Sequence, residues 1–128
     1  MTTVFPNLIY DDADKAIDFL ERTLGFERRD VHQNDAGKVV HAELKFRDAW
    51  LMLSERGAGD PRFDPGGKTL VYIAIDEPQD IDRLYEDAKA AGAEILMEPK
   101  DQDYGSRDFS LTDPEGNIWA FGTYAPGD

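Results

Sequence analysis

The chain has 128 residues, with 14 Lys and Arg against 27 Asp and Glu, which gives a formal net charge of −13. This length suits one compact domain, or two small halves that share a core. The chain has no cysteine, which excludes disulfides and cysteine-based metal sites. The acidity disfavours nucleic acid and anionic membrane surfaces as partners. It favours cationic ligands weakly, unless the charge is only solvated surface.

No apolar run approaches the roughly 20 residues that a membrane span requires. The first ten residues lack the basic region and apolar core of a signal peptide. We therefore expect a cytoplasmic protein.

The first half of the chain predicts a strand, a helix and three more strands. Apolar residues at Ala13, Ile17, Leu20 and Leu24 recur at helical spacing. The expected elements are a strand over Val4–Tyr10, a helix between Asp11–Asp14 and Gly25, and strands over Phe26–Gln33, Lys38–Phe46 and Ala49–Ser54. A tight hairpin at Arg47-Asp48 joins the last two strands.

The second half repeats this order after Glu55–Lys68, a stretch rich in Gly and Pro that is typical of a linker. The expected elements are a strand over Thr69–Ile75, a helix after Asp76–Asp80 that ends at Gly92, and strands over Ala93–Met97, Arg107–Thr112 and Asn117–Tyr124. A turn, Asp113–Gly116, separates the last two strands.

The sequence therefore predicts an α+β fold built from two βαβββ modules, which form a curved mixed sheet. Each helix would cover one face of the sheet, and the other faces would form a central cup. We expect a single domain over residues 1–128, with pseudo-repeats 1–56 and 68–125 and a linker at 57–67.

The element order, together with Asp113–Asn117 before the last strand, resembles the vicinal oxygen chelate superfamily. This superfamily includes glyoxalase I, extradiol dioxygenases, fosfomycin-resistance enzymes and bleomycin-resistance proteins. The joint from Ala16 to Phe26 is similar to the family's first helix and following strand. Tyr104–Pro114 is especially similar to the bleomycin-resistance branch.

The resemblance implies a divalent metal held by His and Glu or Gln at matching strand positions. In this chain those four positions are occupied by Phe5, Met52, Tyr72 and Ala120. The side chains of Phe5, Met52 and Ala120 cannot bind a hard cation, and the Tyr72 side chain is a poor ligand. We therefore expect no metal and no cofactor, and the sequence favours a protein without enzymatic activity over an enzyme.

If Phe46 pairs with Ala49, the hairpin places one row of side chains on the face that points away from the helix. Other candidate residues come from the remaining strands by the same alternation. The candidate ligand-binding residues are Phe5, Asn7, His41, Glu43, Trp50, Met52, Tyr72, Arg107, Phe109 and Ala120. The residues do not settle the facing of the strand that carries Arg107 and Phe109. No catalytic residue stands out.

Several of these residues have an alternative role. Trp50 is either a platform for a ligand or a cover residue at a dimer contact. His41 and Glu43 form either a metal site or an ordinary polar patch. Arg107 binds either the ligand or a neighbouring acid such as Asp108.

The favoured function is that of a metal-free protein that binds a small organic compound. The most specific form of this hypothesis is the sequestration of a cationic or aromatic antibiotic. Aromatic side chains suit flat or cationic groups. The alternatives are a divalent-metal-dependent lyase, isomerase or dioxygenase, and a structural dimer with a vestigial cup. The resemblance implies a homodimer, whose first strand is either exchanged or not. No nucleic acid or membrane partner is expected.

Overall fold

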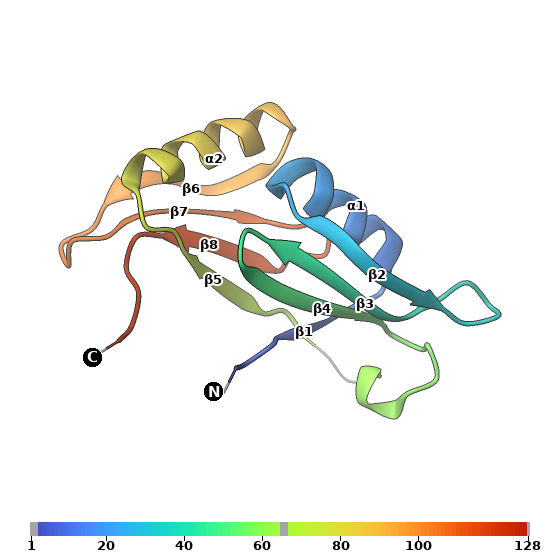
Figure 1. Ribbon diagram of the computed structural model, residues 1–128. Coiled ribbons are helices and arrows are strands. Elements are labelled where there is room, and N and C mark those ends of the chain that lie inside the picture. Colours follow the sequence, from blue (N-terminus) through green and yellow to red (C-terminus); the bar gives the residue numbers. More distant parts are fainter. Residues whose placement is uncertain (1–2, 65–66, 128) are drawn as a thin grey trace. The chain divides into compact units, whose positions relative to one another are not determined.

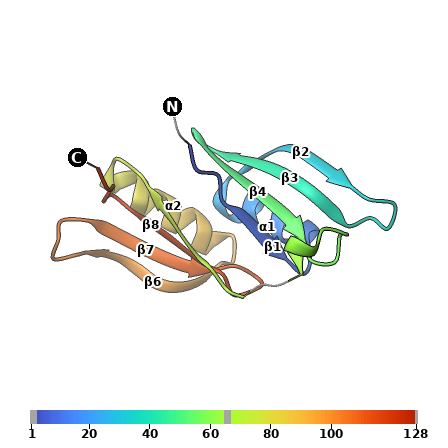
Figure 2. The same ribbon diagram turned by 90° about the horizontal axis from the view of Figure 1, so that it is seen from below.

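The protein is described from a computed structural model, which covers residues 3–64 and 67–127 (Figures 1 and 2). The chain divides into two compact units, with the boundary between Gly67 and Lys68. Part of the predicted linker, residues 65–66, lies outside the described residues, as do residues 1, 2 and 128. The single domain and the cup both stay predictions.

Both units have the predicted βαβββ order, so the α+β fold class is confirmed (Figure 1). The elements of the first unit are β1 (Asn7–Tyr10), α1 (Ala13–Leu24), β2 (Glu27–Gln33), β3 (Val39–Phe46), β4 (Ala49–Glu55) and a 3-10 helix η1 (Pro61–Phe63). The elements of the second unit are β5 (Leu70–Ala74), α2 (Pro78–Ala90), β6 (Glu94–Asp101), β7 (Arg107–Thr112) and β8 (Ile118–Gly122).

The two sheets have the same topology. The first has strand order β1-β4-β3-β2, and the second has order β5-β8-β7-β6. In each sheet the first strand of the module runs parallel to the last, and the other pairs are antiparallel. This identity of topology supports the internal repeat that the order of elements predicts.

Each helix covers one face of its own sheet and buries an apolar core there (Figure 2). In the first unit the predicted apolar row of the hairpin is buried: Ala42, Leu44, Leu51 and Leu53. In the second unit Trp119 and Phe121 are fully buried, and α2 contacts β8 as well as β6 and β7. The opposite face of each sheet therefore carries the polar and half-exposed side chains.

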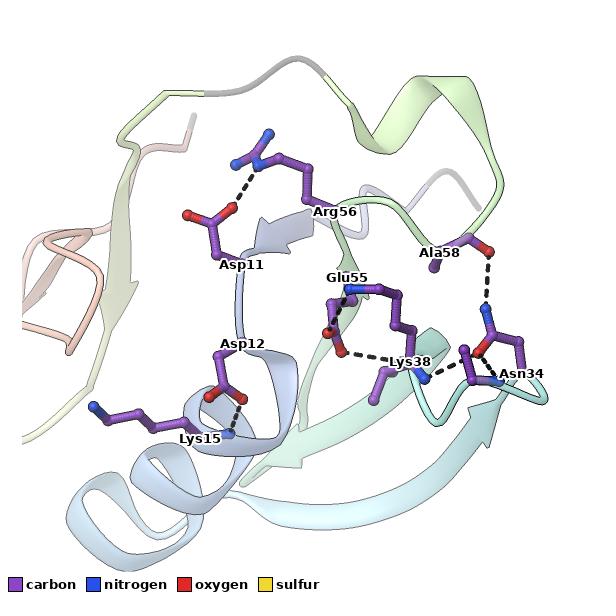
Figure 3. A network of polar contacts seen from close by, with 10 residues as sticks. Asp11, Asp12, Lys15, Asn34, Lys38, Glu55, Arg56 and Ala58 are labelled. Atoms are coloured by element: carbon purple, nitrogen blue, oxygen red, sulfur yellow. Dashed lines mark hydrogen bonds and ion pairs between the residues drawn. The ribbon is translucent and has the colours of Figure 1, made fainter.

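The two helices begin differently. Asp12 caps α1, because its carboxylate accepts a hydrogen bond from the Lys15 backbone N–H at 3.1 Å (Figure 3). α2 begins at Pro78, earlier than the acidic turn Asp76–Asp80 predicts. A proline at the first helical position is pre-set for the helix and has no N–H to leave unpaired.

β6 is also longer than the predicted Ala93–Met97, because it continues through Pro99 to Asp101. Proline donates no hydrogen bond to a sheet and is tolerated on edge strands. β6 is an edge strand, and its register shifts between Met97 and Lys100.

Residues 57–64 of the predicted linker pack within the first unit. Ala58 and Phe63 are buried. The Asn34 amide donates to the Ala58 carbonyl at 3.4 Å, and Arg56 contacts the Asp11 carboxylate at 2.6 Å (Figure 3). Only part of the Gly- and Pro-rich stretch therefore connects the two units.

Neither helix in the described part of the chain has the length and apolar character that crossing a membrane requires.

Candidate functional site

A pocket of about 240 Å³ opens on the face of the first sheet that points away from α1. It is lined by Phe5, Glu43, Trp50, Leu51 and Met52. The β3–β4 register explains this grouping, because Glu43 lies opposite Met52 and Lys45 lies opposite Trp50, as predicted. The structure thus brings together four of the predicted ligand-binding residues: Phe5, Glu43, Trp50 and Met52.

Two cationic side chains of this protein lie over the Trp50 ring. The Lys45 ammonium lies 5.6 Å from the centre of the Trp50 ring, and the Arg29 guanidinium lies 5.9 Å from it. Both distances are within the range of cation–π attraction. Two positive charges therefore lie at this ring, although the protein as a whole is strongly acidic.

Glu43 also belongs to a row of two histidines and two carboxylates on β2 and β3. Sequence reasoning left His32 apart from His41, but the register places them directly opposite each other, with ring centres 6.4 Å apart. Each imidazole Nε2 lies 2.9 Å from a carboxylate oxygen, His41 from Glu43 and His32 from Asp30. The row is a pair of His–carboxylate contacts side by side.

Asn7 lies one step further along the first sheet. It pairs with Met52, and its side-chain oxygen accepts a hydrogen bond from the buried Ser54 hydroxyl at 3.3 Å. Asn7 is therefore next to the residues of the pocket, and it positions the end of β4.

The positions that the resemblance assigns to metal ligands do not fit a divalent cation. Tyr72 pairs with Ala120 in the second sheet, whereas Asn7 rather than Phe5 pairs with Met52 in the first. If Asn7 is taken as the candidate metal ligand of β1 in place of Phe5, the four candidate positions gain only one amide oxygen, which already accepts a hydrogen bond. Within residues 3–64 and 67–127, no three His, Cys, Asp or Glu side chains form a group that could hold a metal ion.

Tyr72 lies on the face of the second sheet that points away from α2. Its hydroxyl donates to the Tyr124 carbonyl at 2.6 Å. Burial raises the pKa of Tyr72 above its usual value, and the nearby Asp108 carboxylate raises this pKa further. Tyr72 is therefore neutral and acts as a hydrogen-bond donor.

This raised pKa predicts a loss of stability at alkaline pH. Above pH 10 the folded protein keeps the Tyr72 proton that the unfolded chain releases, so the free energy of unfolding falls as pH rises through the folded value. Urea unfolding at several pH values from 9 to 12 is the measurement. We expect the loss above pH 10 to be smaller in Tyr72→Phe, and an unchanged slope in that variant would contradict the assignment.

Phe109 and Arg107 lie on the opposite face of the second sheet from Tyr72, which settles the facing of β7. Phe109 is fully buried between Phe121, with ring centres 5.1 Å apart, and Tyr85 of α2, at 5.7 Å. Its prediction as a ligand-binding residue is corrected, because it belongs to the core under α2.

Arg107 has a structural role. Its guanidinium binds the carboxylates of Asp82 on α2 at 2.9 Å and Asp101 on β6 at 3.1 Å. These hydrogen bonds raise its pKa above the usual value. Arg107 therefore clamps α2 to the edge of the sheet, and Asp108, the partner that the sequence suggests, points to the other face.

The sequence reasoning missed a polar cluster beside Tyr72. Asp108 accepts hydrogen bonds from the hydroxyls of Ser106 and of Tyr104, the latter at 2.9 Å. The Ser106 hydroxyl also accepts from the Tyr124 backbone N–H at 3.0 Å. The alternation Tyr104-x-Ser106-x-Asp108 indicates that these three polar side chains share one face. The sequence pattern alone does not show which face of β7 this is.

The family model of the Glyoxalase/Bleomycin resistance protein/Dioxygenase superfamily matches residues 3–121 of this chain. An uncharacterized protein of Mycobacterium bovis, Mb0911c, is 27% identical over 124 residues, which cover 91% of this chain and 80% of that protein.

Two solved structures are similar over nearly the whole chain. TioX from Micromonospora sp. ML1 has 28% identity and a TM-score of 0.77, over 98% of this chain and all of that chain. Lactoylglutathione lyase from Agrobacterium tumefaciens has 20% identity and a TM-score of 0.73, over 95% of this chain and 93% of that chain. At 20% identity the second likeness concerns the fold alone.

Proposed function

This chain belongs to the glyoxalase/bleomycin resistance protein/dioxygenase superfamily, and on that premise we propose that it is a metal-free protein that binds a small aromatic compound against Trp50. The observation that carries the proposal is the pocket lined by Phe5, Trp50, Leu51 and Met52, with Glu43 as its polar group. Binding sites for small organic molecules are mostly apolar, with a few polar groups that fix orientation.

The size of the pocket limits what it holds. About 240 Å³ is below the roughly 300–1,000 Å³ that is typical of sites for drug-sized ligands. The pocket therefore suits one fused ring system, either as a whole ligand or as the aromatic part of a larger compound such as an antibiotic.

The aromatic version of the proposal is favoured over the cationic one at this pocket. Lys45 and Arg29 already lie over the Trp50 ring, and the Glu43 carboxylate already contacts His41. A cationic ring would meet the two like charges over Trp50, whereas the carboxylate that an anionic ring would meet, that of Glu43, already faces His41.

A charge series on one ring tests this proposal: naphthalene, 1-naphthoate and 1-naphthylmethylammonium, titrated against Trp50 fluorescence. We expect the neutral and anionic rings to bind more tightly than the ammonium. The contribution of an aromatic pair predicts that Trp50→Ala weakens binding about threefold to tenfold. Isothermal titration calorimetry checks the affinities independently of fluorescence.

The controls use the rest of the chain. Trp50→Phe keeps an aromatic ring and should retain most of the affinity, while the buried Trp119 remains as an internal fluorescence reference. Leu96→Ala removes an exposed apolar side chain of the second unit and should change nothing. Equal affinity in Trp50→Ala and wild type would refute the proposal.

A metal-dependent enzyme of the same superfamily is the second candidate, and it needs ligands beyond His41 and Glu43, because the described residues hold no group of three His, Cys, Asp or Glu side chains that could bind a metal ion. The two histidines and two carboxylates of the β2–β3 row lie on the same face as the pocket and share Glu43 with it. Stoichiometric Ni, Zn, Mn or Fe(II) in the purified protein, lost in both His41→Ala and His32→Ala, would favour this candidate.

A further inference from the structure

Three half-exposed tyrosines lie together in the second unit. The rings of Tyr104 and Tyr124 have centres 6.1 Å apart and meet at 89°. Tyr72 joins them through its hydrogen bond to the Tyr124 carbonyl. Their exposed fractions are 38% for Tyr72, 65% for Tyr104 and 52% for Tyr124, so the rings are accessible to a ligand.

A nearly buried carboxylate lies at the centre of this tyrosine cluster (Tyr72, Tyr104 and Tyr124 around Asp108). Asp108 is 9% exposed and accepts hydrogen bonds from neutral hydroxyls, those of Tyr104 and Ser106. In the part of the chain that the structure describes, no lysine or arginine lies within ion-pair distance of Asp108. A nearly buried carboxylate without an ion-pair partner is unusual, because charges out of water are normally paired.

Arrangements of aromatic rings with a negative charge are the recognised binding sites for alkylated ammonium ions. Such an ion is weakly hydrated, so ring faces replace its water at little cost, and a carboxylate nearby supplies the opposite charge. We propose that the tyrosine cluster around Asp108 is a binding site for an alkylated ammonium group.

The difference from Trp50 supports this assignment. The ring of Trp50 is covered by two cations of its own chain, whereas, among the described residues, no lysine or arginine lies over the ring of Tyr72, Tyr104 or Tyr124. One internal competitor is Lys100, which stands opposite Asp108 in the β6–β7 register without forming an ion pair with it. The assignment does not rest on the proposed function, because all of its residues belong to the second unit.

The test uses choline and its uncharged isostere 3,3-dimethyl-1-butanol as probes of the full chain. Chemical shifts of the amides of Tyr104, Ser106, Asp108 and Tyr124 are followed by NMR. We expect choline to saturate these shifts in the millimolar range, and the alcohol to bind at least fivefold more weakly. Added NaCl should weaken choline binding alone, because salt screens the attraction to Asp108.

Variants separate the ring from the charge. Tyr124→Leu removes only a ring, because Tyr124 takes part in the hydrogen bonds of the cluster through its backbone. We expect it to weaken choline binding about twofold to fivefold. Asp108→Asn should weaken it about fivefold, and Lys100→Gln should tighten it.

The exposed position of Tyr124 keeps the test decisive if Asp108→Asn fails to fold, as circular dichroism would reveal. Equal affinity for choline and the alcohol would overturn the proposal, because it would show an apolar contact alone. The absence of saturation, or shifts centred on Trp50 in place of the cluster, would overturn it as well.

Discussion

Replacing Asp113 by alanine is expected to destabilise the protein by about 3–5 kcal/mol. The Asp113 carboxylate is buried and accepts hydrogen bonds from four donor groups of the described residues. The donors are the backbone N–H groups of Glu115 and Asn117, both at 3.0 Å, the Asn117 amide at 3.2 Å and the Trp119 indole N–H at 3.1 Å. Each buried donor left without a partner costs about 1–3 kcal/mol.

The loss spreads beyond the turn because Asn117 also holds β5. Its side-chain oxygen accepts a hydrogen bond from the Thr69 backbone N–H at 3.0 Å. Asp113→Asn is expected to lower the free energy of unfolding less than Asp113→Ala does. One oxygen acceptor remains in Asp113→Asn, although the new NH₂ group faces two donors. Asp35→Asn, in an exposed turn, is the control and should stay within about 0.5 kcal/mol of wild type.

Thermal unfolding of Asp113→Ala in a Trp50→Phe background measures this effect through Trp119 alone. A loss of 3–5 kcal/mol corresponds to a fall in Tm of roughly 10–25 °C. A fall below a few degrees would show that the four hydrogen bonds are replaced by water at little cost. The same scan followed through Trp50, with Trp119→Phe, tests the predicted single domain, because one domain requires both fluorophores to report one transition.

The second large effect is expected for Gly122→Ala. A methyl group on Gly122 would lie 2.5 Å from the Tyr72 hydroxyl and still closer to an oxygen of Asp108. Overpacking of this kind costs about 1–3 kcal/mol. If the Asp108 carboxylate moves away from Tyr104 and Ser106, their lost hydrogen bonds add about 1–3 kcal/mol.

Urea unfolding followed by circular dichroism measures this loss of stability. A double variant tests whether the loss comes from the clash with Asp108. Gly122→Ala combined with Asp108→Ala should be less destabilised than the sum of the two single variants, because the second change removes the atoms that the methyl group meets. Gly127→Ala, where nothing lies within 4 Å of the added group, is the matched control. Additive effects in the double variant would contradict the clash.

Much of the candidate pocket was predictable from sequence because it depends on one hairpin. The short turn at Arg47-Asp48 fixes which residues of β3 and β4 face each other, and a strand alternates its faces with period two. The sequence therefore predicts Glu43, Trp50 and Met52 on one face, and all three line the pocket. Alternation along the first strand adds Phe5 to this prediction, and Phe5 is among the residues that line the pocket.

The sites in the second unit were less predictable. β6 and β7 are joined by a longer loop, residues 102–106, and their register shifts twice. A bulge changes which residue faces which side, and no alternation pattern encodes its position. The sequence therefore predicts Phe109 as a ligand-binding residue although it lies in the core, and it offers Asp108 only as a partner for Arg107.

The sequence by itself determined the two βαβββ modules, the buried rows of the hairpin and the lack of hard ligands at the family's metal positions. The modules and the buried rows follow from local periodicity and turn chemistry, and the metal positions follow from the resemblance, so none of these needs a distant partner. Only the tertiary structure decided which distant residues meet: His32 with His41, Arg107 with Asp82, and Tyr72 with Tyr124 and Asp108. Such meetings depend on strand register and on the facing of one edge hairpin, which are set by packing across the whole unit.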